Sequence, residues 1–481
     1  MRVIFIGLLT LLFVTLMPVF ADDSVKLEII YPKNNATVNA SSVFIVGNTE
    51  PDASLIINNQ PVKISPNGAF VQVTGLIKGA NNINIKSTKG HATNEINYIL
   101  NVPEKNQAIQ PCPLEPLSLT AETTKDYAVT RTAPTQNRLT PLPVGTILNI
   151  TGKIGNSYRF KYSNSNDGWI SESDIRILPT GNYITENIIS TLTVDSDENY
   201  VHLKLPLIQK IPFLIEQNSE NQMNLKLFNA KAGITLFSYD NVSNFLKELK
   251  WTQDSNNCLN LAIKVNSKQF WGYKYYYEGN TLILKLRKPP QINSKHPLKG
   301  KIICIDAGHG GTELGSVGPT GIPEKLINLE IANNLRRILE RKGAKVIMTR
   351  DSDKDVGLDD RVNVANSNEA PVIVSIHNNA LPDGKNPYIE HGTSTYYYHF
   401  QSLPLAKSIQ QSLVPTMGFK DLGVIYSSFV LIRPTEALSV LVEVGFMINP
   451  DEYNLLITPE FQEKAAIGIS QGLENFFLSQ I

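Results

Sequence analysis

Hydrophobic and polar residues alternate in two different ways before and after about residue 300. Residues 25–102 alternate short apolar stretches with turn signals such as Asn34-Asn35 and Pro66-Asn67-Gly68. Strands of this length at this spacing predict a β-sandwich. Short strands are also predicted in residues 126–179 and 183–290, where runs such as YVHLKLP and TLILKLR recur. We therefore expect the chain before residue 300 to consist of small all-β modules.

After residue 300, continuous apolar runs alternate with amphipathic segments. The runs KIICIDA, PVIVSIH and SVLVEVGF predict strands that are buried on both faces. Residues 324–342, 403–414 and 459–478 predict helices, because their apolar side chains recur at helical spacing. The predicted fold class is a multidomain protein whose C-terminal α/β domain spans residues 300–481. In that domain a twisted, mostly parallel sheet is covered by helices, and small all-β modules precede it.

Composition and charge fit this organisation and exclude some partners. The chain has 481 residues, too many for one hydrophobic core. Lys and Arg together number 44, as do Asp and Glu, so no net field draws the chain toward nucleic acid or anionic lipid. The three cysteines, Cys112, Cys258 and Cys304, are too few and too scattered to predict a disulfide framework or a metal site.

The first residues predict export. A basic start, Met1-Arg2, precedes an apolar run that ends at Ala21, and the polar residues Asp22 and Asp23 follow. This pattern is typical of a secretory signal peptide over residues 1–21. An uncleaved membrane anchor is the alternative, which Pro18 and the abrupt change of polarity disfavour. Further along, residues 103–125 carry several prolines without apolar periodicity and are interpreted as a linker.

Four ionisable residues stand at the ends of elements in the C-terminal domain. His309, His377 and Glu443 each end a predicted strand, and Glu324 opens the first predicted helix. Functional groups gather where the strands of such sheets end. Two imidazoles and one carboxylate suit a zinc ion with a fourth position for water, and the further carboxylate can take the proton of that water. From the residues alone, a zinc site and structural histidines both remain open. His391 and His399 have weaker surroundings and are left out of the metal shell.

The C-terminal sequence also resembles a known family. IDAGHGG, PEKLINLEIANNL, KVIMTR, LDDRVNVAN, VSIHNNA and LVEVGFMINP occur in the order of the zinc-dependent N-acetylmuramoyl-L-alanine amidases, which cleave peptidoglycan. The resemblance implies that His309, Glu324 and His377 bind zinc and that Glu443 is the catalytic carboxylate. It also implies that Arg433 lies near the substrate cleft. One departure is Ser394-Thr395, since the family commonly has a glutamate in this segment.

The β modules have resemblances of their own. Residues 25–102 resemble bacterial immunoglobulin-like modules, residues 126–179 resemble Src-homology-3-like modules, and residues 183–290 resemble the β module that precedes many secreted amidase domains. A place in a binding groove and core packing are alternatives for Trp169, and glycan binding and core packing are alternatives for the aromatic cluster in residues 270–277. Core packing is favoured for the cluster, because alternating strand faces bury about half of such side chains.

These resemblances imply a peptidoglycan hydrolase that cuts the amide between N-acetylmuramic acid and L-alanine outside the cytoplasm, in the periplasm or cell wall. The alternatives are another zinc amide hydrolase, such as a carboxypeptidase or deacetylase, and a non-catalytic wall-binding protein. The helical motifs HExxH and HxxEH are absent, which disfavours the first. Dependence on an activator protein and the oligomeric state are left open by the sequence.

Overall fold

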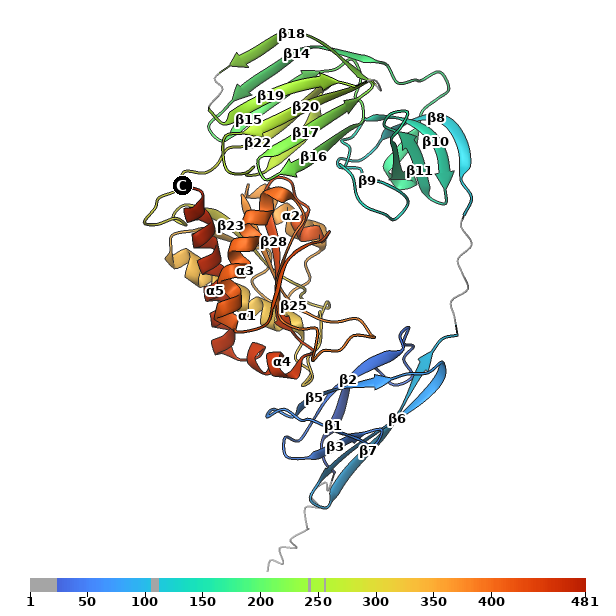
Figure 1. The fold of residues 1–481 in the computed structure, drawn as a ribbon, viewed down its shortest axis with the longest axis vertical. Helices are drawn as coiled ribbons and strands as arrows, with labels where there is room; N and C mark the ends of the chain where they lie inside the picture. The colour runs from blue at the N-terminus through green and yellow to red at the C-terminus, as the bar shows by residue number, and fades with distance from the viewer. Residues whose placement is uncertain (1–23, 105–111, 241–243, 255–256) are drawn as a thin grey trace, which may run out of the picture.

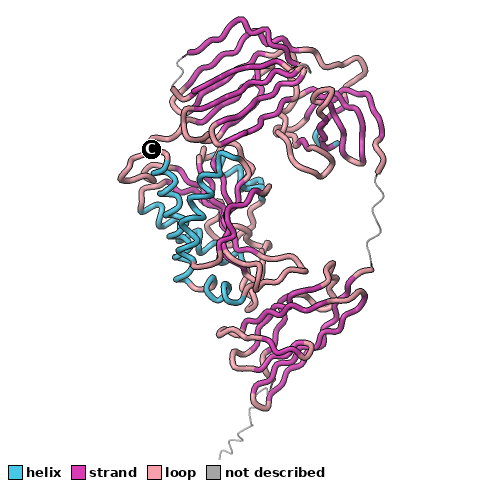
Figure 2. Tube along the Cα trace, in the orientation of Figure 1, coloured by secondary structure: helices cyan, strands magenta, loops and turns pink. Residues whose placement is uncertain are grey.

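A computed structural model describes residues 24–104, 112–240, 244–254 and 257–481 of the chain. The predicted signal peptide lies outside these residues. Three all-β modules precede a C-terminal α/β domain, as Figure 1 shows. Helices belong mainly to that last domain (Figure 2). The predicted fold class is therefore confirmed. Within the described residues, no helix is long and apolar enough to cross a membrane.

β module 1 (residues 24–104) packs two antiparallel sheets against each other around buried side chains such as Phe70 and Ile85. One sheet has the order β1-β2-β5 and the other β4-β3-β6-β7. The strands are β1 (Leu27–Tyr31), β2 (Ser42–Thr49), β3 (Ser54–Ile57), β4 (Gln60–Val62), β5 (Ala69–Gly75), β6 (Gly79–Lys89) and β7 (Ala92–Val102).

β module 2 (residues 112–178) corrects the predicted linker, because β8 (Glu115–Thr123) lies inside residues 103–125. This strand pairs with two neighbours in a sheet of order β13-β8-β10-β11-β12-β9. Its proline, Pro116, lies where the register with β10 shifts at Gly152, and such a bulge tolerates a missing N–H donor. The other strands are β9 (Thr130–Arg131), β10 (Ile147–Ile154), β11 (Ser157–Lys161), β12 (Asp167–Ser171) and β13 (Ile175–Ile177).

β module 3 (residues 187–287) has a five-stranded sheet, β18-β14-β15-β22-β21, and a four-stranded sheet, β16-β17-β20-β19. Modules 2 and 3 share one hydrophobic core, to which Phe160 and Phe213 both belong. The strands are β14 (Asn187–Ser196), β15 (Tyr200–Pro206), β16 (Phe213–Ser219), β17 (Gln222–Phe228), β18 (Ala230–Asp240), β19 (Leu246–Gln253), β20 (Cys258–Val265), β21 (Tyr273–Glu278) and β22 (Thr281–Arg287).

The C-terminal domain (residues 300–481) has a six-stranded sheet of order β24-β23-β25-β28-β26-β27. Only the β26–β28 pairing is antiparallel, as expected for a mostly parallel sheet. Helices α1, α3 and α5 cover one face, and α2 covers the other over a smaller core that contains Cys304. The strands are β23 (Ile302–Ala307), β24 (Lys345–Met348), β25 (Val372–Asn379), β26 (Thr393–Tyr397), β27 (Asp421–Tyr426) and β28 (Leu438–Phe446). The helices are α1 (Glu324–Arg341), α2 (Leu358–Ser367), α3 (Leu403–Met417), α4 (Pro450–Leu456) and α5 (Pro459–Ser479).

The aromatic cluster in residues 270–277 is mostly core, as favoured from the sequence. Phe270 and Trp271 are fully buried, and Tyr276 is the most exposed of the set. Trp271 reaches out of module 3 into the core of the C-terminal domain, where its ring lies 5.6 Å from Phe476 and 5.7 Å from Phe477. The boundary near residue 300 is therefore a packed interface. Trp169 is also buried, within module 2.

Candidate metal centre

His309 and His377 are brought together by a glycine-lined turn at the carboxyl end of β23. A Cβ on Gly308 would lie 2.2 Å from Cε1 of His377, so only glycine lets the second imidazole approach the first strand. His309 itself has φ +59°, an uncommon left-handed conformation for a non-glycine residue. The two rings lie 4.9 Å apart at 81°.

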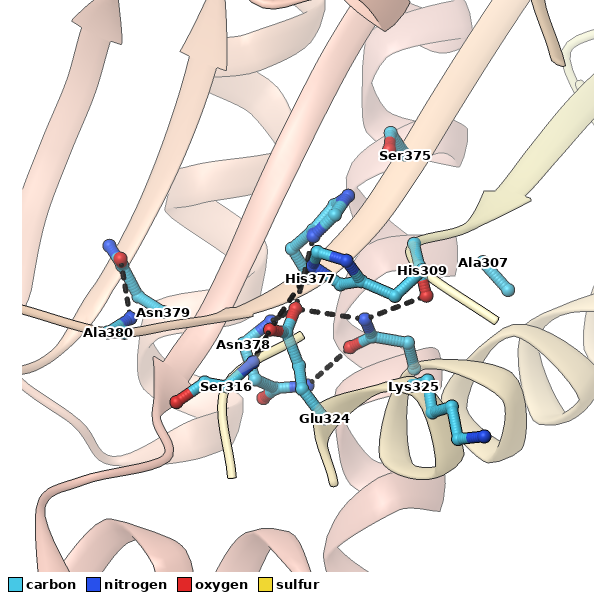
Figure 3. A network of polar contacts seen from close by, with 12 residues as sticks. Ala307, His309, Ser316, Glu324, Lys325, Ser375, His377, Asn378, Asn379 and Ala380 are labelled. Atoms are coloured by element: carbon cyan, nitrogen blue, oxygen red, sulfur yellow. Dashed lines mark hydrogen bonds and ion pairs between the residues drawn. The ribbon is translucent and has the colours of Figure 1, made fainter. Parts of the chain in front are cut away.

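Glu324, at the first position of α1, points between the two imidazoles (Figure 3). Its Oε2 lies 3.3 Å from Nε2 of His309, and its Oε1 lies 3.1 Å from Nδ1 of His377. One donor atom from each residue lies within 4.8 Å of the others. Two ligands bound tetrahedrally to zinc at about 2.0–2.1 Å are about 3.3 Å apart, and the two separations from Glu324 are close to that value. The three predicted ligands therefore converge on one point.

The Glu324 carboxylate is held firmly in place. The backbone N–H of Ser316 donates to Oε2 at 2.9 Å, and that of Asn378 donates to Oε1 at 3.0 Å. Asn328, one turn further along α1, adds a third hydrogen bond at 3.0 Å. Burial would raise the pKa of Glu324, but the hydrogen bonds and charges of the two imidazoles hold that pKa well below its usual value. The hydrogen bond from His309 also raises the pKa of that imidazole. The carboxylate is therefore ionised and ready to bind a cation.

Glu443 lies beside this cluster, in register with His377 on the neighbouring strand. Its Oε2 is shielded from solvent and has no hydrogen-bond partner among the described residues. Burial, with the negative charge of Glu324 added, raises the pKa of Glu443 well above its usual value. Ser394 faces Glu443 across the antiparallel pairing, and its buried Oγ likewise has no partner among the described residues. An uncompensated buried carboxyl of this kind is typical of a reactive group rather than a structural one.

Two buried arginines, to which the sequence analysis assigned no role, hold the turn that carries His309. Arg350 donates from Nε to the Ala307 carbonyl at 2.7 Å and from Nη2 to the Gly308 carbonyl at 2.9 Å. Nη2 also donates to the Lys325 carbonyl at 2.7 Å, which ties the turn to the first residues of α1. Because these bonds end on backbone oxygens, no side-chain pattern in the sequence indicates them.

Arg361, on α2, completes this support. Its Nη2 donates to the His309 carbonyl at 2.7 Å, and its Nη1 donates to the Ala307 carbonyl at 2.8 Å. Nη1 also pairs with Asp306 at 2.9 Å, and both side chains are buried. Burial would raise the pKa of Asp306, but the charge of Arg361 and two hydroxyl donors hold that pKa below its usual range. The backbone of the turn that carries His309 is thus fixed by a buried ion pair.

Comparison with known proteins bears on this geometry. Residues 303–475 match the N-acetylmuramoyl-L-alanine amidase family, a range that contains all four predicted site residues. The germination-specific N-acetylmuramoyl-L-alanine amidase of Bacillus subtilis is 37% identical over 202 residues, which are 38% of this chain and 81% of that protein. The chain belongs to this amidase family. LytC of Bacillus subtilis, also an N-acetylmuramoyl-L-alanine amidase, is 34% identical over 41% of this chain and 40% of its own length.

A solved structure, the catalytic domain of the amidase CwlV from Bacillus (Paenibacillus) polymyxa var. colistinus, is 36% identical, with a TM-score of 0.35. It covers 38% of this chain and 99% of its own. The prediction of a peptidoglycan-hydrolysing N-acetylmuramoyl-L-alanine amidase is confirmed by the family match and the named relatives. A non-catalytic wall-binding protein and a different zinc hydrolase are correspondingly disfavoured. The family match covers the amidase domain and none of the three β modules.

Three other residues from the sequence analysis lie away from the cluster. Arg433 precedes β28, toward the opposite end of the strand from Glu443, so it lies away from the metal centre, and its expected place near the substrate cleft stays a prediction. His399 is half-buried, with Nε2 2.8 Å from the Arg433 carbonyl oxygen, and the loss of solvent around it lowers its pKa to about 4. His391 contacts Glu452 at 2.7 Å, which links the loop before β26 to α4. Neither His391 nor His399 belongs to the cluster of His309, Glu324 and His377, and the sequence analysis likewise left both out of the predicted metal shell.

β module 1 contacts the amidase domain on the loops that leave the metal centre. In the loop before α1, the Pro319 carbonyl accepts a hydrogen bond at 2.9 Å from Nδ2 of Asn48, which is buried. In the loop after β25, Asp383 accepts the hydroxyl of Tyr31 at 2.7 Å. Ile448, just after β28, joins one apolar cluster with side chains of β2 and β5 (Phe44, Val46 and Val71). The sequence analysis expected no such contact between the first and last parts of the chain.

Proposed function

We propose that this enzyme hydrolyses the amide between the lactyl group of N-acetylmuramic acid and L-alanine with one zinc ion, bound by His309, Glu324 and His377. The observation that carries the proposal is the convergence of these three donors beside the unpaired carboxyl of Glu443. Zinc, when bound, supplies a positive charge that lowers the pKa of a coordinated water toward about 7.

The residues of the chain then have distinct tasks. Glu443, whose Oε2 has no competing hydrogen bond among the described residues, accepts the proton of the attacking water and passes it to the departing amide nitrogen. Glu324 keeps both imidazoles oriented, and the backbone donors around it prevent its rotation. The buried walls of β25 and β28 limit the water that competes for Glu443. Burial and the charge of Glu324 raise the pKa of Glu443, and a zinc ion held by His309, Glu324 and His377 would lower it toward the value that a base needs.

The substrate places the enzyme outside the cytoplasmic membrane, in the periplasm or cell wall, because peptidoglycan lies there. The signal-like residues 1–21 support export. Mass spectrometry of secreted protein should find a chain that begins at Asp22. Full-length protein retained in the membrane would contradict this.

Digestion of intact sacculi tests the reaction. Cleavage at the proposed bond yields peptide-free glycan chains and intact stem peptides with a new amino group on L-alanine. The activity should be lost with a zinc chelator and return when zinc is restored. New reducing ends would indicate a glycosidase, and shortened stems still attached to muramic acid would indicate a carboxypeptidase. Either product pattern would overturn the proposed bond.

Two substitutions separate metal binding from proton transfer. His309→Ala should lower zinc content, because it removes a ligand. Glu443→Gln should keep both zinc and fold but lose about 10²–10⁴ in turnover, since an amide cannot accept the proton. Metal analysis and rate measurements on the same preparations distinguish the two effects. A Glu443→Gln enzyme within a few-fold of the parent would exclude Glu443 as the base.

A further inference from the structure

A large cavity lies where β modules 2 and 3 meet the amidase domain. Its volume is about 680 Å³, within the range of small-molecule binding sites. It is separate from the metal centre: Glu436, which lines it, precedes β28, while Glu443 is near the other end of that strand. At about 3.3 Å per residue, the seven-residue separation corresponds to roughly 23 Å. The cavity therefore belongs to the opposite end of the sheet.

The walls of the cavity are packed and continuous across the modules. Tyr275 of module 3 donates its hydroxyl to the Pro141 carbonyl of module 2 at 3.0 Å. The backbone N–H of Tyr273 donates to the Thr435 carbonyl of the amidase domain at 2.7 Å. Gly272 packs so closely that a Cβ there would lie 2.3 Å from the Glu436 carbonyl oxygen. These contacts join modules 2 and 3 and the amidase domain around the cavity.

An unbroken row of aromatic rings lines the cavity and runs through all three parts. Each ring contacts the next, with centroid separations of 5.6, 6.4, 6.3, 4.8 and 5.5 Å. In order, the rings are those of Tyr127, Tyr275, Tyr273, His399, Tyr398 and Tyr426. Aromatic faces with a polar edge suit ligands that combine apolar faces with hydroxyl groups, as sugar rings do.

Two half-buried guanidinium groups also line the cavity. Arg138 makes no side-chain hydrogen bond or ion pair with any described residue, and Arg433 donates only to Ser428. Burial and the positive charge of Arg433 lower the pKa of Arg138, and burial likewise lowers that of Arg433. Two cations in one partly buried space are unfavourable until an anion joins them.

The carboxylates that line the cavity do not neutralise Arg138 and Arg433. Glu216 pairs with Lys226 at 2.7 Å, and Glu436 pairs with Lys274 at 3.4 Å. The remaining two, Asp126 and Asp359, are exposed at the rim. The arginines are thus left for a carboxylate of the ligand, and Arg–carboxylate pairs are among the stronger hydrogen-bonded contacts in proteins.

We propose that this cavity binds a glycan that carries a carboxylate, with the more exposed rings of Tyr127, Tyr398 and Tyr426 against its sugars and with Arg138 and Arg433 on its carboxylate. The choice of glycan rests on the proposed function. Hydrolysis of the muramyl amide leaves a lactyl carboxylate on muramic acid, so the peptide-free product chain has this chemistry. A second point of attachment would hold the enzyme on the strand that it has already stripped.

Binding measurements on the full-length, metal-free protein test this without turnover. Four probes are titrated by calorimetry: peptide-free GlcNAc–MurNAc oligosaccharides, the same chains with their carboxylates converted to methylamides, chito-oligosaccharides and free stem peptides. Only the first should bind tightly. Arg138→Met should weaken that binding by about 10- to 100-fold, and Arg138→Lys should restore part of it.

A second variant and two matched controls keep the test independent of folding. Tyr426→Ala removes an exposed ring of the row and should weaken binding several-fold. Arg176→Met in module 2 and Tyr276→Ala on the other face of β21 lie outside the cavity and should leave affinity unchanged.

Equal affinity of the parent and Arg138→Met, or tight binding of the neutral chains, would overturn the proposal. Arg138-dependent binding of stem peptides alone would also overturn it, because the carboxylate would then come from peptide. Failure of the proposed function would appear differently, as intact sacculi in the digestion assay.

Discussion

Arg361→Met is the substitution that most directly tests how the turn that carries His309 is held in place. Methionine keeps much of the side-chain volume but removes the guanidinium. The change leaves Asp306 without its charge partner in a site where both side chains are nearly inaccessible, at 4% and 1% exposure. It also removes the donors to the Ala307 and His309 carbonyls. Zinc affinity and stability should therefore fall together.

The expected size follows from the burial of the pair. Removing one partner of a buried ion pair typically costs about 3–5 kcal/mol, because the other charge is left uncompensated. For a domain of this size each kcal/mol corresponds to about 2–4 °C, so the midpoint should fall by about 6–20 °C. Arg336→Met is the matched control: its partner, Glu340, lies on the exposed surface of α1, where such pairs contribute about 0.3–0.5 kcal/mol.

The pH dependence of the stability shows whether the uncompensated charge of Asp306 causes the loss in Arg361→Met. In the parent, the pKa of Asp306 is lowered, so its ionisation stabilises the fold above about pH 3.9 and is lost as pH falls through the folded-state pKa. Without Arg361, burial raises that pKa above its unfolded value. Protonation then stabilises the folded variant at low pH, and this stabilisation is lost as pH rises through the raised pKa. The stability gap between parent and variant should accordingly narrow between pH 7 and pH 4.

The test measures the thermal unfolding midpoint and the zinc content at several pH values. The proteins compared are the parent, Arg361→Met and Arg336→Met. The double variant Asp306→Asn/Arg361→Met should recover part of the loss, because no buried charge remains. An Arg361→Met protein within 1 kcal/mol of the parent, or a gap independent of pH, would refute the reasoning.

Three further substitutions probe other contacts. Gly308→Ala should lower zinc content without unfolding the β modules, since its Cβ would lie 2.2 Å from the His377 ring; full zinc occupancy would contradict this. Trp271→Ala should cost about 3–5 kcal/mol, measured by denaturant unfolding, and more than truncation of the 40%-exposed Trp251. Asn48→Leu should loosen β module 1 from the amidase domain and increase the radius of gyration in X-ray scattering, and an unchanged curve would count against that contact.

The sequence was sufficient to predict the amidase domain and its cluster because both depend on strong local patterns. His309 and His377 stand where apolar runs stop, and parallel strands that run in the same direction deliver their ends to one edge of a sheet, whereas Glu324 opens the first helix. Glu443 lies beside His377 because β28 pairs with β25, and its role as the catalytic carboxylate was implied by the family resemblance. Hydrophobic periodicity also predicted α1 correctly: the expected helix over residues 324–342 is found as Glu324–Arg341.

Other features depend on contacts that leave no local pattern. Arg350 and Arg361 act on backbone carbonyls, which every residue possesses. The strand β8 was hidden by its flanking prolines, because its alternation is short and Pro116 occupies a bulge. The position of Arg433 was inferred from resemblance alone, whereas the direction of β28 places it at the far end of the sheet.

The module contacts change how the whole chain is understood. The sequence suggests independent units joined by linkers, yet the β modules pack on opposite ends of one sheet. β module 1 rests on the loops around the metal centre, and modules 2 and 3 enclose the cavity at the other end. Trp271 fixes the second arrangement by filling a pocket in the amidase core. A domain cut at residue 300 would lose this side chain and expose the pocket, so the β modules contribute to the stability of the amidase domain.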